Sequence, residues 1–133
     1  MTRTVIPTAQ AASEAIRSEL EQGDKDFALR MVIQAVSDFR KIVAENDKST
    51  IEEFLAAPST TGSLRWDTLL AAAIGRECRL SGIARPDWTY PKPLDTWWFV
   101  DATPLLMVRN MRRTAPDLEC VGIWLDKSAF ETA

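Results

Sequence analysis

Three arginines near the C-terminus, Arg109, Arg112 and Arg113, are the residues whose type and spacing best suit ligand chemistry. Spacings of three and four residues place them on one face of a helix. Guanidinium groups bind phosphates and carboxylates, so this face fits either a nucleic acid or an acidic protein surface. The alternative interpretation is a solvated face whose arginines pair partly with Asp117 and Glu119. The spacing by itself leaves these interpretations open.

Residues 83–98 form a second candidate binding element because they are rich in proline and tryptophan. The prolines exclude a helix and favour an extended loop that loses little freedom on binding. Trp97 and Trp98 are adjacent, so in an extended segment one should point inward and the other outward. Tryptophan dominates many protein interfaces, but in a domain of this size it also completes the core. The candidate partner-binding residues are therefore Trp88, Trp97, Trp98, Arg109, Arg112 and Arg113.

The residues that most enzymes require are missing or scattered in this chain. It contains no histidine, which excludes histidine-based triads, HExxH zinc sites and an imidazole base. The aspartates form no pair or metal-binding run, and the five glycines are isolated instead of forming a phosphate-binding loop. We therefore expect a protein that is not an enzyme and uses no metal and no cofactor.

The two cysteines, Cys78 and Cys120, are too few for a zinc site and lack CxxC spacing. Cys78 falls on the apolar face of an expected helix, and Cys120 precedes an expected strand. Both are predicted to be reduced, packed thiols. The N-terminus does not look like a signal peptide, and no apolar run is long enough to span a bilayer. These features predict a cytoplasmic protein with no membrane contact.

Length and charge narrow the class of protein further. The 133 residues, 46% of them hydrophobic, predict a single domain, residues 1–133, with its own core. Residues 1–57 carry ten acidic and seven basic residues and no tryptophan, whereas residues 58–133 are neutral and hold all five tryptophans. We expect these ranges to be a helical N-terminal part and a Trp-rich C-terminal part. The net charge of −3 excludes a polycation that coats duplex DNA.

Periodicity and capping residues predict a mainly α protein, a single-core helical domain of about five helices. Gly23 and Asp24 separate the first two helices, and Thr50 and Glu53 have the spacing of a capping box. Ser63 is placed to cap the fourth helix. The first two helices are expected at 8–22 and 25–45, and the third is a short helix that Pro58 stops. The fourth and fifth are expected at 64–81 and 104–114, and Asp126 should cap a last turn.

A small antiparallel β element near the C-terminus completes the expected fold, formed by residues 98–100 and 121–125. The first helix has a narrow apolar stripe, which suits a surface position or contact with another chain. The pattern is therefore compatible with a homodimer. The helix with the three arginines should turn Leu106, Met107 and Met111 away from them. The expected core includes Val32, Phe39, Leu70, Ile74, Leu106 and Ile123.

Several motifs between Phe54 and Asp126 occur together in one known group of proteins. They are Arg65-Trp66-Asp67 at the start of a helix, Pro86-Asp87-Trp88 in a loop, Trp97-Trp98-Phe99 in a strand, and the closing segment 122–126. As a set they resemble the C-terminal region of actinobacterial helix-turn-helix regulators, many of which are antitoxin-like. Genes of this group often stand beside a gene for a nucleotidyltransferase-type toxin.

The resemblance implies a non-enzymatic antitoxin of a toxin-antitoxin system, which binds and neutralises a cognate toxin protein of nucleotidyltransferase type. Residues 8–57 depart from the group, because the helix expected at 25–45 is too long for the short second helix of a helix-turn-helix motif. This departure argues against DNA binding and autoregulation by this half of the chain. The alternative function is a small transcriptional or nucleic-acid-binding regulator that uses the Arg109 helix.

Overall fold

The computed structural model describes residues 7–100 and 104–131, and within these ranges it is mainly helical. Five helices have seven residues or more, and a two-stranded sheet lies near the C-terminus, which confirms the expected fold class. The elements are α1 (Ala9–Glu21), α2 (Lys25–Glu45), α3 (Lys48–Phe54), α4 (Leu64–Ser81), η1 (Asp87–Thr89), β1 (Trp98–Phe99), α5 (Pro104–Arg113), α6 (Pro116–Glu119), β2 (Ile123–Trp124) and η2 (Lys127–Phe130).

The first two helices begin and end as their capping residues predict. The Thr8 hydroxyl accepts the Ala11 N–H at 3.0 Å, and Asp24 Oδ1 accepts the Phe27 N–H at 3.0 Å. Gly23, between the two helices, takes the left-handed conformation at φ 75°, which costs a glycine little. The bounds of α1 and α2 therefore agree with the expected ranges to within one residue.

The capping box expected at Thr50 and Glu53 is wrong, because α3 begins earlier. Asp47 occupies the N-cap position: its Oδ1 accepts the Ser49 N–H at 3.1 Å, and its Oδ2 accepts the Thr50 hydroxyl at 2.9 Å. The Asp47 carboxylate, about one turn before Thr50, accepts a hydrogen bond from a free backbone N–H at the start of the helix, so the helix begins there and not at Thr50. These hydrogen bonds lower the pKa of Asp47, and the one from the Thr50 hydroxyl has the largest effect. Together they outweigh the opposite effect of burial, which would raise the pKa.

The start of α4 differs from its expected capping in one detail. Ser63 is the N-cap residue, but its hydroxyl makes no capping hydrogen bond. Asp67, in the first turn, instead accepts the Thr61 N–H at 2.7 Å and the Thr61 hydroxyl at 2.6 Å. The helix therefore fastens the linker before it through a side chain that points backwards along the chain.

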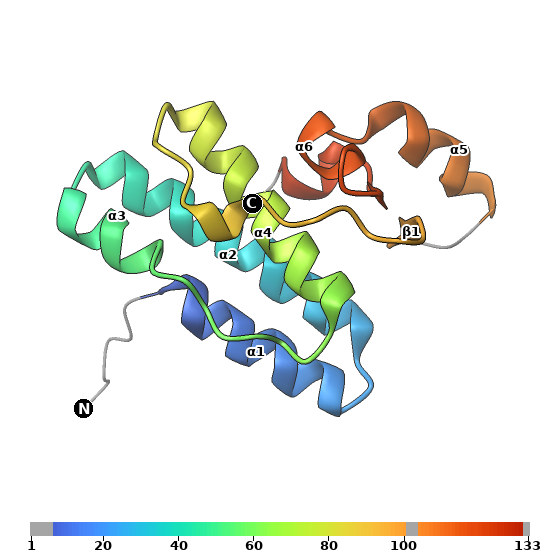
Figure 1. The fold of residues 1–133 in the computed structure, drawn as a ribbon, viewed down its shortest axis with the longest axis horizontal. Helices are drawn as coiled ribbons and strands as arrows, with labels where there is room; N and C mark the ends of the chain where they lie inside the picture. Colours follow the sequence, from blue (N-terminus) through green and yellow to red (C-terminus); the bar gives the residue numbers. More distant parts are fainter. Residues whose placement is uncertain (1–6, 101–103, 132–133) are drawn as a thin grey trace.

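The core lies between α2 and α4, with α1 along one side of α2 (Figure 1). Phe39 of α2 contacts Phe54 of α3, with ring centroids 5.0 Å apart. One hydrophobic cluster includes side chains from both 1–57 and 58–133. Val32, Phe39, Leu70, Ile74 and Ile123 are buried in it as expected, whereas the Leu106 side chain lies outside the described residues.

The expected antiparallel orientation of the β element is wrong, because β1 and β2 are parallel. Trp98 pairs with Ile123 and Phe99 with Trp124. The chain between them contains α5 and α6, so it crosses back and enters β2 in the direction of β1. Parallel pairing needs such a crossover, whereas antiparallel pairing is usual across a short turn. None of the helices in the described ranges has the length and apolarity needed to cross a membrane.

Candidate partner-binding surface

Two uncharged polar side chains, one in α5 and one just after it, point inward. Asn110 is only 4% exposed, and its Oδ1 accepts the Asp126 N–H at 3.2 Å. The buried Thr114 hydroxyl, just after α5, accepts the Leu125 N–H at 2.9 Å. These two side chains satisfy backbone donors of the segment that follows β2, a role that apolar side chains could not fill. These hydrogen bonds hold the described part of α5 with Asn110 turned toward the segment that follows β2.

The outward side of α5 carries apolar side chains and one arginine. Val108 is 58% exposed and Met111 is 43% exposed, and Arg112, one turn after Val108, is also exposed. At 3.6 residues per turn, Val108 and Arg112 lie opposite the inward pair Asn110 and Thr114. Met111 lies across the helix from Arg109 and Arg113, as expected, but its side chain is exposed and not packed into the protein. The inward positions are taken by the residues that bind the β2 segment.

The three arginines differ in their partners. Arg109 and Arg113 both pair with Asp126, with Nε to Oδ2 distances of 3.3 and 3.0 Å. Arg112 makes no ion pair within the described part of the chain. The alternative pairing with Asp117 is wrong, because that carboxylate pairs with Arg79 and Arg85 instead. Two of the three guanidinium groups therefore share one carboxylate, and the outer face of α5 is cationic.

Trp97 is the exposed aromatic residue of this region, at 60% exposure. Its ring stands edge-on against the buried Trp124, with centroids 5.3 Å apart and planes at 71°. It also lies over Gly122, where an added Cβ would stand 3.6 Å from Trp97 Cδ1. Phe99 stacks on Trp124 at 6.1 Å. The outward indole is therefore held in place by the β2 segment, to which α5 is also attached.

We call this region the C-terminal surface. Helix α5 contacts β2, and β2 pairs with β1, so the three elements form one unit at the upper right of Figure 1. The surface is defined by six residues: Trp97, Val108, Arg109, Met111, Arg112 and Arg113.

The other two candidate tryptophans lie elsewhere. Trp98 is half-buried and contacts Trp66 of α4 edge-on at 5.1 Å, and the Arg65 guanidinium lies 5.8 Å from its ring. Trp88 is also half-buried, and its Nε1 donates to the Leu55 carbonyl at 2.8 Å. Of the adjacent pair, Trp98 points inward and Trp97 outward, as the alternation predicts. Only Trp97 and the three arginines share the C-terminal surface.

Two buried donors beside this surface were not found from the sequence. Trp124 Nε1 and Asn110 Nδ2 are inaccessible to solvent and have no hydrogen-bond acceptor among the described residues. The spacing of Asn110 and Thr114, four apart in an arginine-rich helix, is the signal that could have indicated a polar inner face. Buried donors are normally satisfied, so these two are exceptions in the packing beneath the outer face of α5.

The cysteines and carboxylates show no catalytic arrangement in the described ranges. Cys78 is buried as predicted, and burial raises the pKa of its thiol to about 11. The prediction of a packed Cys120 is wrong: this thiol is exposed, because it ends the short helix α6 at the surface and only donates to the Asp117 carbonyl at 3.4 Å. Among the described residues, no group of three or more Cys, Asp and Glu side chains is placed to hold a metal ion.

Comparison with protein-family models, with curated proteins and with solved structures finds no match for this chain. The C-terminal surface is therefore interpreted from its own geometry.

Proposed function

We propose that the protein is a non-enzymatic, antitoxin-like binder that neutralises a cognate toxin protein in the cytoplasm by covering its active site. One observation carries the proposal: α5 presents Val108 and Met111 to solvent and buries Asn110. A helix that only completes its own fold has the opposite arrangement. The resemblance of residues 54–126 to antitoxin-like regulators supports the same function.

The apolar part of the surface suits burial in a protein groove. Exposed apolar residues that gather on one helix are typical of helices that dock into a partner. Trp97 adds a large side chain whose ring is already fixed against Trp124, so little rotamer freedom is lost on binding. Tryptophan and arginine are also the residues that most often dominate interface energies.

The charge of the surface indicates the chemistry of the partner. Arg112 has no carboxylate partner in the described ranges, and Arg109 and Arg113 share only Asp126. The whole chain nevertheless has a net charge of −3, so this cationic face is a local feature. An apolar groove with an acidic rim would complement it, because opposite charges speed encounter and fix orientation.

The test is co-expression with the product of the neighbouring gene, followed by co-purification. Val108→Asp and Arg112→Glu should each abolish the complex while leaving the melting temperature unchanged, because both side chains are exposed. Leu80→Asp is the matched control, since Leu80 is 55% exposed on α4, outside the surface, and this variant should bind normally.

Two results would contradict the proposal. One is a wild-type chain that does not associate with the neighbouring product, and the other is a complex that both surface variants form normally. Binding of duplex DNA that weakens steeply with salt, and that Arg112→Glu removes, would instead favour the small nucleic-acid-binding regulator.

A further inference from the structure

A cleft of about 520 Å³ opens between the linker that precedes α4, the first half of α4 and the proline-rich loop. Its volume lies in the usual range of ligand pockets. Most of its wall is apolar, formed by Pro58, Leu64, Ala71, Trp88, Pro91 and Pro93. Neither Trp97 nor α5 contributes to it, so the cleft is separate from the C-terminal surface.

Both sides of the cleft are fixed by hydrogen bonds. On the linker side, the Ser59 N–H donates to Gln10 Oε1 at 2.7 Å, which ties the linker to α1. On the loop side, Trp88 Nε1 donates to the Leu55 carbonyl at 2.8 Å, and the Leu94 N–H donates to the Val121 carbonyl at 2.9 Å. The two walls of the cleft are therefore anchored to different parts of the fold, one to α1 and the other to Leu55 and Val121.

One carboxylate in the cleft is positioned with an open acceptor site. Asp67 Oδ1 accepts the N–H and the hydroxyl of Thr61, and its Oδ2 accepts the Thr60 hydroxyl at 2.5 Å. A carboxylate has about four acceptor positions, so one position on Oδ2 is left. No lysine or arginine in the described ranges forms an ion pair with Asp67.

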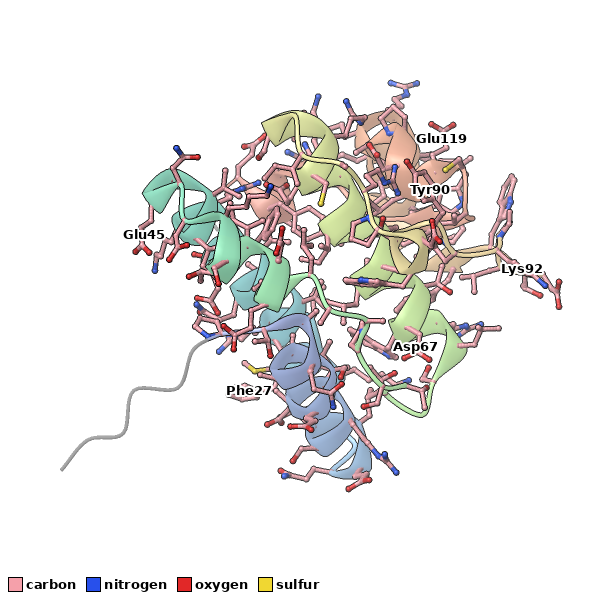
Figure 2. All side chains as sticks on the ribbon, turned by 60° about the vertical axis from the view of Figure 1, so that its left-hand side comes forward. Phe27, Glu45, Asp67, Tyr90, Lys92 and Glu119 are labelled. Carbon is pink, nitrogen blue, oxygen red and sulfur yellow. The ribbon has the colours of Figure 1, made fainter. Side chains whose placement is uncertain are left out.

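The other charged groups of the cleft leave its charge negative. Asp95 and Lys92 also line the cleft, so with Asp67 its lining contains two carboxylates and one ammonium group. Figure 2 shows Lys92 on the same side of the molecule as Asp67, and the two form no ion pair. The cleft therefore combines an apolar, aromatic wall with a fixed carboxylate that has no cationic partner among the described residues.

We propose that this cleft binds an arginine side chain from an extended segment of a partner protein. The guanidinium would donate to Asp67 Oδ2, and the neighbouring apolar side chains of the segment would lie on Trp88 and the prolines. Arginine fits better than lysine because its planar, weakly hydrated head enters apolar surroundings more readily. This contact has the opposite charge preference to the C-terminal surface, so it can be tested independently.

The test is an NMR titration of the full chain with the blocked tripeptide acetyl-Leu-Arg-Leu-amide. The reporter is the indole N–H signal of Trp88, identified by its absence in Trp88→Phe. The control peptide replaces arginine by citrulline, which has nearly the same shape but no charge. We expect the arginine peptide to shift the Trp88 signal and to bind about tenfold more tightly than the citrulline peptide.

Variants of the protein separate the carboxylate from its surroundings. Asp67→Asn keeps an oxygen acceptor for Thr61 but removes the charge, so it should lower the affinity for the arginine peptide to that for the citrulline peptide. Asp87→Asn makes the same charge change at an exposed aspartate outside the cleft lining, and should bind as the wild type does. If Asp67→Asn does not fold, the affinities of the two peptides for the wild type still show whether the cleft prefers a charged guanidinium.

Three results would overturn the proposal. They are equal affinities of the two peptides for the wild type, an unchanged Trp88 signal at saturating arginine peptide, or equal losses in Asp67→Asn and Asp87→Asn. None of these bears on the C-terminal surface, which the co-expression experiment tests alone.

Discussion

The guanidinium of Arg85 fills the space in which a side chain at Gly75 would begin. A Cβ built on Gly75 would overlap the Nη2, Cζ and Nε atoms of Arg85. The guanidinium is held there from other sides as well: Nη2 donates to the Thr89 carbonyl at 2.6 Å, Nη1 lies 3.3 Å from Asp117 Oδ2, and the Tyr90 ring centroid is 4.1 Å away. Gly75 thus allows α4, η1 and α6 to meet at one arginine.

Gly75→Ala should therefore destabilise the protein. In an ordinary helix interior, replacing glycine by alanine stabilises by about 1 kcal/mol. Here the added methyl group must displace an arginine that several contacts hold, and overpacking of this kind costs about 1–3 kcal/mol. We expect a net loss of about 1 kcal/mol in the free energy of unfolding, measured by urea denaturation.

A double-mutant cycle with Arg85→Ala isolates the cause. Once the guanidinium is removed, the methyl group at position 75 meets nothing, so Gly75→Ala should then stabilise by its helix propensity. If Gly75→Ala has the same sign in both backgrounds, the close approach of Arg85 to Gly75 does not control this position.

Asp117 should make the stability depend on pH. Burial alone would raise the pKa of Asp117, but the hydrogen bonds and charge of Arg79, with the charge of Arg85, outweigh burial and hold the pKa below its ordinary 3.8. Because the folded pKa is lowered, the stabilisation is complete above the ordinary pKa and is lost as the pH falls through the folded value. The melting temperature of the wild type should exceed that of Asp117→Asn at neutral pH, and the difference should shrink below about pH 4. A constant difference down to pH 2–3 would show that Asp117 does not titrate as described.

The helices could be predicted from the sequence because their signals are local. The bounds of α2 follow from Asp24 and from a regular apolar period, and Asp126 caps η2 as expected, with its Oδ1 accepting the Ser128 N–H at 3.0 Å. Where two local signals compete, the outcome depends on geometry. Thr50 and Glu53 have capping-box spacing, but Asp47, three residues before Thr50, occupies the cap position of α3.

The candidate site could be predicted only in part, because its arrangement depends on contacts that are distant in the sequence. Periodicity predicts that Arg109 and Arg113 lie near each other, but not that both reach Asp126. The inward rotation of Asn110 depends on the Asp126 backbone, and the parallel pairing depends on the crossover through α5 and α6. The cleft at Asp67 is formed by two separate segments, 58–71 and 88–95, which no local sequence pattern brings together.

The two cysteines should differ sharply in reactivity. Cys78 is buried, and its raised pKa of about 11 leaves very little thiolate at neutral pH. Cys120 is exposed and should react first. In the native protein we expect a chromogenic disulfide reagent to modify one thiol rapidly, and two thiols in denaturant. Cys120→Ser should remove the rapid reaction, and Cys78→Ser should leave it unchanged; a rapid reaction that survives Cys120→Ser would show that Cys78 is accessible.

The tryptophans should separate into those that stabilise the fold and the one that is free to bind. Trp88 and Trp98 are half-buried against the core, so Trp88→Ala and Trp98→Ala should each cost about 3 kcal/mol of unfolding free energy. Trp97 is 60% exposed, so Trp97→Ala should lose only about 1 kcal/mol, the value of its edge contact with Trp124. Arg112→Ala should not change stability measurably.

Urea denaturation gives the stability of each variant, and co-purification with the neighbouring gene product gives its binding. Trp97→Ala and Arg112→Ala should fold and lose the partner, because both residues contribute to the C-terminal surface and neither supports the core. If both variants bind normally, or if Trp97→Ala unfolds as Trp98→Ala does, the C-terminal surface is not the docking site.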